Sequence, residues 1–226
     1  AQEGRLDFSW DAAEKNGADC VCGNITRVYK GIPLPQSMQL KSECFNIENT
    51  RLYDHENIMN KLYISCFGIN DYPVNLVGKL YKRQLITEAI IGKPIVKFMG
   101  EDLSVTLKVM PKITRLAIIP NVVYYYRVGG GSSKFMPYML TDFLELYLEK
   151  SRICEEYALG IQVKKLMDIE LMNIAKEYLV MCREKGGYKG TDLRKEINAL
   201  VSNPIIENSA MFLNRNDINH NMAKWI

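Results

Sequence analysis

The sequence predicts an α/β region that is followed by a mostly α-helical region, with the change near residue 135. Two observations favour this division. Up to residue 135, segments with helical spacing alternate with segments rich in β-branched and aromatic residues. After Phe135, apolar residues recur at helical spacing over three long segments. We therefore expect two domains, residues 1–135 with a mixed sheet and residues 136–226 built of helices.

In the first region, Leu6, Trp10 and Ala13 have helical spacing, and Asn16-Gly17 is a typical helix end, which predicts a helix over 5–16. A strand is expected over 18–29. Further segments follow in order: a polar stretch that we leave unassigned (36–50), a helix (54–65), a short helix after Arg83, a helix opened by Gly100, and two strands (113–119 and 122–127).

In the second region, three apolar stripes predict three helices. The stripes consist of Met139, Phe143, Leu146, Ile153 and Tyr157; of Met167, Leu171, Ile174, Tyr178 and Cys182; and of Leu193, Ile197, Leu200 and Val201. We expect these stripes to pack on each other. An alternative is that the helical tail contacts a membrane surface near Lys224 and Trp225, or pairs with a second copy of the chain.

Composition limits the function classes. The formal net charge is +3 and the basic residues are scattered, which argues against a nucleic-acid partner. Six cysteines are spread mostly singly, as is typical of reduced, structural thiols in a cytoplasmic protein, and a structural zinc site is not expected. The sequence contains no run of about 18 consecutive apolar residues, so it does not predict a membrane-spanning helix.

The informative motifs lie between residues 78 and 133. They are Gly78-Lys79-Leu80-Tyr81-Lys82-Arg83, then Gly100-Glu101-Asp102, then Tyr124-Tyr125-Tyr126-Arg127 with Ser132-Ser133, and upstream Gly17-Ala18-Asp19-Cys20-Val21-Cys22-Gly23. In this order they resemble the second half of bacterial family 2 glycosyltransferases over residues 5–135. The resemblance implies an incomplete GT-A-like mixed sheet and an enzyme of polysaccharide biosynthesis.

Inverting sugar transfer needs a general base that takes the proton of the attacking acceptor hydroxyl. The resemblance implies that Asp102 is this base and that Glu101 supports it or contacts the acceptor. A carboxylate at a helix start is kept ionised by the free backbone N–H groups. The alternative is that both acids only stabilise the helix N-terminus.

Three further candidates concern the substrates. Arg127 is a candidate for gripping the donor diphosphate, because a guanidinium pairs with phosphate oxygens, and Ser132 and Ser133 lie in a glycine-rich loop that could close over the donor. Lys79 is a candidate acceptor contact. The alternatives are a strand-end Arg127 beside an ordinary turn and a solvated Lys79.

The chain departs from the family in one large respect. The nucleotide-binding half, including an Asp-x-Asp metal motif, is absent. The resemblance implies a divalent cation (Mg²⁺ or Mn²⁺) in the full enzyme, with its ligands outside this chain, and the chain is expected to begin just after the metal motif.

Two functions stay open. The chain is expected to be the acceptor-side part of a transferase that moves a sugar from a nucleotide-sugar donor to a cell-surface polysaccharide or lipid-linked acceptor, in the cytoplasm or at the inner face of the membrane. The alternative is a non-catalytic glycan-binding or assembly subunit without a donor site. A chance match of the motifs in an unrelated α+β domain is a third interpretation.

Overall fold

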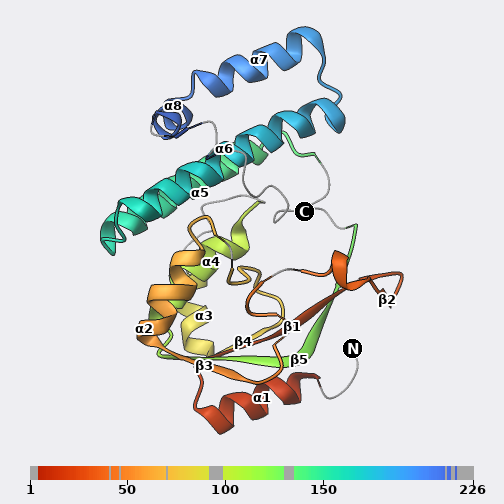
Figure 1. The fold of residues 1–226 in the computed structure, drawn as a ribbon, viewed down its shortest axis with the longest axis vertical. Coiled ribbons are helices and arrows are strands. Elements are labelled where there is room, and N and C mark those ends of the chain that lie inside the picture. Colours follow the sequence, from red (N-terminus) through yellow and green to blue (C-terminus); the bar gives the residue numbers. More distant parts are fainter. Residues whose placement is uncertain are drawn as a thin grey trace. The chain divides into compact units, whose positions relative to one another are not determined.

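The computed structural model describes residues 5–40, 42–45, 47–69, 71–91, 99–129, 135–211, 213–214 and 217. These residues divide into two compact units, one from residues up to 91 together with 102–129, the other from 99–101 together with residues from 135 onward. The first unit contains a mixed sheet with helices, and the second contains helices (Figure 1). This confirms the expected α/β region followed by a helical region.

The sheet is organised around its longest parallel pair. Strand β1 (Cys20–Tyr29) runs parallel to β5 (Arg115–Arg127). Strand β3 (Arg51–Asp54) pairs antiparallel with the outer edge of β5. On the other edge of β1, β4 (Lys79–Tyr81) pairs with its beginning and β2 (Ile32–Pro33) with its end, both antiparallel. The predicted sheet is therefore present as a mixed, five-stranded sheet.

Helices cover both faces of this sheet. Figure 1 shows α1 (Arg5–Asn16) on one side and α2 (His55–Asn57), α3 (Arg83–Ile90) and α4 (Glu101–Val109) on the other. A π-helix (Ile58–Tyr63) extends α2, and two short 3₁₀ helices lie at Gln36–Met38 and Met110–Lys112.

The helix predicted over 5–16 is confirmed, but of the apolar residues that showed its spacing only Ala13 packs against the sheet. Leu6 and Trp10 are exposed, at 77% and 60% of their surface. Ala13 and its neighbour Ala12 pack against the sheet, in a core formed by Ala18, Val21, Ala117 and Ile119. Small alanines let the helix approach the sheet closely, so close packing decides which face is buried, against the hydrophobicity of the larger side chains.

Strand β5 is continuous where two strands were expected, although Pro120 interrupts the sequence. The register between β1 and β5 shifts between Cys22 and Asn24, opposite Pro120. A proline lacks the N–H group that a regular ladder needs, so it is tolerated at such an irregularity. Gly23 lies at this register shift, where a larger residue would not fit, because a Cβ there would lie 2.3 Å from a methyl carbon of Val123.

A buried carboxylate joins three strands at one end of the sheet. Asp19, directly before β1, accepts hydrogen bonds from the backbone N–H groups of Thr114 and Arg115 at 2.8 and 3.1 Å, and from the Thr114 hydroxyl at 2.5 Å. The Lys82 ammonium, directly after β4, pairs with it at 2.5 Å. Burial by itself would raise the pKa of Asp19, but these hydrogen bonds outweigh it and lower the pKa to about 2.

The second unit consists of helices α5 (Met139–Glu156), α6 (Ile161–Glu184), α7 (Gly190–Val201) and α8 (Pro204–Ala210). The first three were predicted. The stripe of α6 is largely buried, whereas on α7 only Leu200 of the four predicted residues is buried. Helix α8 was missed, although Asn203 caps it through a bond from the Ile205 N–H, with Pro204 in the first turn.

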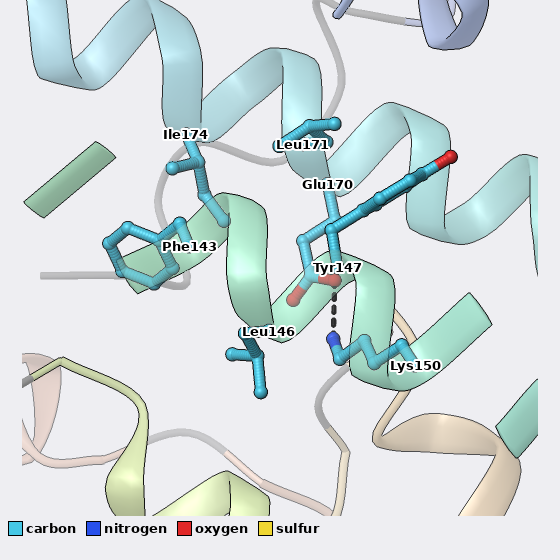
Figure 2. A pocket seen from close by; sticks show the side chains of 7 residues that line it. All are labelled: Phe143, Leu146, Tyr147, Lys150, Glu170, Leu171 and Ile174. Atoms are coloured by element: carbon cyan, nitrogen blue, oxygen red, sulfur yellow. Dashed lines mark hydrogen bonds and ion pairs between the residues drawn. The ribbon is translucent and has the colours of Figure 1, made fainter. Parts of the chain in front are cut away.

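Charged and polar side chains lie among the apolar ones between α5, α6 and α8. Lys150 and Glu170 form a buried ion pair at 2.5 Å (Figure 2). The Tyr147 hydroxyl donates to Asp168 at 2.5 Å and accepts a hydrogen bond from Ser209 at 3.0 Å. These contacts link the three helices. Removing one partner of such a buried pair leaves an uncompensated charge and is strongly destabilising.

The first prediction concerns Asp19→Asn. Because the folded-state pKa of Asp19 lies below its ordinary value of 3.8, its ionised form stabilises the fold above about pH 4, and this stabilisation is lost as the pH falls toward 2. The shift corresponds to about 2 kcal/mol at neutral pH. We expect urea unfolding at pH 7 to show a loss of about this size for Asp19→Asn, and a smaller difference from wild type near pH 2.

Asp11→Asn is the matched control, because Asp11 lies on the exposed side of α1. Its effect on stability is expected to be within about 0.5 kcal/mol. Equal effects of the two substitutions at pH 7 would contradict the role given to Asp19.

Candidate functional site

The predicted base, Asp102, lies in the first turn of α4 and is half-buried. Its carboxylate accepts a hydrogen bond from the Leu76 N–H and lies in the field of the Lys79 ammonium. Desolvation raises the pKa of Asp102 above its ordinary value, and the Leu76 and Lys79 interactions offset only part of this rise. A carboxylate with a raised pKa is a stronger base, which suits proton abstraction.

Lys79 extends from β4 into the loop that precedes it. Its ammonium donates to the carbonyl oxygens of Pro73 and Asn75 and lies 4.9 Å from the centre of the Tyr72 ring. The ammonium is therefore held within the chain by two carbonyls and an aromatic face. These contacts make Lys79 a positioning residue, and its role as an acceptor contact stays a prediction.

The loop 73–76 connects Lys79 to Asp102. Lys79 holds this loop from β4, and the Thr106 hydroxyl holds it from α4 through a 2.8 Å bond to the carbonyl of Val74. Two residues after Val74, the backbone N–H of Leu76 donates a hydrogen bond to the Asp102 carboxylate. Because Thr106 lies one helical turn after Asp102, the loop is fixed on the helix that carries the carboxylate.

Among the described residues, the structure gives no hydrogen bond or ion pair between Asp102 and the other residues that the sequence predicted for the site. Glu101 is the first residue of α4 and is exposed. Arg127 ends β5 opposite Val28 and is exposed, and within the described residues no hydrogen bond or ion pair joins it to Asp102. Ser132 and Ser133 lie outside the described residues. The structure thus brings together Asp102 and Lys79 from the predicted set.

Sequence reasoning missed the contribution of the loop. Leu76 acts through its backbone amide, which any residue except proline supplies, so no sequence pattern identifies it. Thr106 lies four residues after Asp102, and this i, i+4 spacing on a helix was the one usable signal.

The described residues also bear on the cofactor and membrane expectations. Across the described ranges, no group of three or more His, Cys, Asp or Glu side chains could hold a metal ion. The ligands of the divalent cation that the family resemblance implies are expected outside this chain, and that expectation stays a prediction. Over the same ranges, none of the helices has the length and apolarity needed to cross a membrane.

Comparisons with known proteins do not assign a family. Neither a protein-family model nor a curated protein matches the chain. The resemblance to family 2 glycosyltransferases therefore rests on the ordered motifs quoted above.

The second prediction concerns Lys79→Met. Removing the ammonium takes away a charge that favours the Asp102 carboxylate and releases the loop that carries the Leu76 N–H. Since both interactions lower the pKa of Asp102, we expect this pKa to rise further. The side-chain carboxyl ¹³C shift of Asp102 during an NMR pH titration measures it directly.

Lys82→Met provides the matched control, because Lys82 pairs with Asp19. It is expected to raise the pKa of Asp19 and to leave that of Asp102 unchanged. An Asp102 titration curve that is the same in Lys79→Met and wild type would show that Lys79 does not position this carboxylate.

Proposed function

We propose that the chain is the acceptor-side part of an inverting, family 2-like glycosyltransferase with a GT-A-like fold. The observation that carries the proposal is the half-buried Asp102 carboxylate, which has a raised pKa and is fixed by a loop that β4 and α4 hold from two sides. The motif order adds support, because the Gly78–Arg83 motif forms β4 beside β1 and the Glu101-Asp102 motif opens α4.

In this proposal Asp102 acts on the acceptor. It accepts the proton of an acceptor hydroxyl while that oxygen attacks the anomeric carbon of the donor sugar. The new glycosidic bond forms as the bond from the anomeric carbon to the diphosphate breaks, and the electron pair of that bond leaves with the diphosphate. Attack from the face opposite the leaving group inverts the anomeric configuration.

Arg127 has the complementary role in the proposal. Its guanidinium is permanently charged and can bind two phosphate oxygens at once, so it stabilises the negative charge that develops on the leaving diphosphate. Its exposure at the end of β5 leaves it accessible to such a ligand. The donor base and the divalent cation would be bound by residues other than those described.

The third prediction concerns Asp102→Asn in the full-length protein that contains this chain. Loss of a general base typically slows the chemical step by about 10²–10⁴-fold. We expect the rate of sugar transfer from the nucleotide sugar to fall by this factor, with little change in the KM for the donor. The fold should persist, because desolvation already penalises the ionised side chain that Asn replaces.

Glu56→Gln serves as the control, since it removes an exposed carboxylate from α2, which carries none of the candidate site residues. Its effect is expected to be much smaller. Transfer by Asp102→Asn at nearly the wild-type rate would overturn the assignment of the base. Glycan binding without any transfer, in both wild type and variant, would favour a non-catalytic binding or assembly subunit.

A further inference from the structure

The face of the first unit that carries α1 has an open cleft of about 550 Å³. It lies between α1, the turn before β1, and the junction of β4 with α3, and its lining includes Trp10, Glu14, Leu80 and Arg83. Leu80 packs against the core beneath α1. Successive side chains of a strand point to opposite faces, so Lys79, which holds the Asp102 loop, faces away from this side. Asp102, Lys79 and the residues of loop 73–76 are not among those that line the cleft.

Trp10 is the unusual residue of this cleft. It remains 60% exposed although a smaller side chain on the same helix, Ala13, is used for packing. An exposed indole offers a large, rigid apolar surface whose burial by a ligand is favourable, and it loses little conformational freedom on binding.

The charged groups of the cleft divide into a paired and an unpaired set. Asp19 and Lys82 neutralise each other at 2.5 Å. Glu14 and Arg83 are exposed, and no ion pair among the described residues involves either side chain. The cleft thus presents one free carboxylate acceptor and one free guanidinium donor beside an indole, and its formal charges balance.

This combination selects among ligand classes. A nucleotide or free phosphate needs an excess of positive charge, which the balanced lining does not provide. A pyranose ring with equatorial substituents has an apolar C–H face that stacks on an indole, and hydroxyl groups around its rim that both donate and accept hydrogen bonds. A carboxylate and a guanidinium in the same cleft satisfy both kinds of hydroxyl contact.

We propose that the cleft of Trp10, Glu14 and Arg83 is a binding site for a neutral oligosaccharide of equatorially substituted pyranose rings. A sugar ring stacks on the Trp10 indole, its hydroxyls donate to Glu14, and Arg83 donates to its oxygens. The site goes beyond the proposed transferase function, because its contacts include neither Asp102 nor Lys79.

The experiment is a titration of the ¹⁵N-labelled chain with cellotetraose at millimolar concentrations, followed by NMR. We expect saturable shifts of the Trp10 indole N–H and of the backbone amides near Arg83. Stacking of a base on an aromatic side chain changes affinity by about 5- to 150-fold in nucleic-acid complexes. By that measure Trp10→Ala should weaken binding at least about fivefold.

Phe8→Ala is the matched control, since Phe8 is a half-exposed aromatic residue of the same helix that does not line the cleft. It should bind cellotetraose like wild type, and so should Asp102→Asn. The Asp102→Asn comparison distinguishes the cleft from the proposed transferase site. If the transferase proposal is wrong, cellotetraose should still bind to the cleft.

Three results would overturn the proposal. They are the absence of saturable shifts with cellotetraose, equal affinity of Trp10→Ala and wild type, and a response at these residues to inorganic phosphate instead of the sugar. Since Trp10 is exposed and makes no core contact in the α1 cluster, Trp10→Ala is expected to fold, which its own NMR spectrum verifies.

Discussion

The first unit depends on a single carboxylate. Asp19 lies directly before β1. Its carboxylate oxygens accept hydrogen bonds from the backbone N–H groups of Thr114 and Arg115 at the start of β5, and pair with the Lys82 ammonium after β4. A buried carboxylate is stable only when its oxygens are satisfied, so the position of Asp19 fixes the relative registers of three strands at once. The Asp19 pKa of about 2 reflects how strongly these hydrogen bonds favour the ionised carboxylate over the protonated form.

That register gives the two faces of β4 different roles. With Tyr81 opposite Cys20 and Lys79 opposite Cys22, Lys79 lies on the face where its ammonium holds loop 73–76 and, through that loop, Asp102. Leu80 lies on the face of α1 and closes the floor of the Trp10 cleft. A slip of one residue would exchange these faces and abolish both arrangements.

Sequence reasoning succeeded where a signal is local. Helix 5–16 was found from its spacing and its Asn16-Gly17 end, and α4 from its acidic start. It failed where packing between distant segments decides the outcome. The spacing of apolar residues in α1 did not show that Ala12 and Ala13 are the ones that pack in the core. No sequence pattern identifies the Leu76 amide that donates to Asp102. The exposed strand β3 has too few residues for a periodic signal.

The most direct test of the central proposal is a donor screen. The full-length protein containing this chain would be incubated with a panel of nucleotide sugars and a glycan or lipid-linked acceptor fraction, and nucleoside diphosphate release would be measured. The proposal predicts acceptor-dependent release with at least one donor and a product of inverted anomeric configuration. A folded protein that releases nucleoside diphosphate from none of the donors would contradict it.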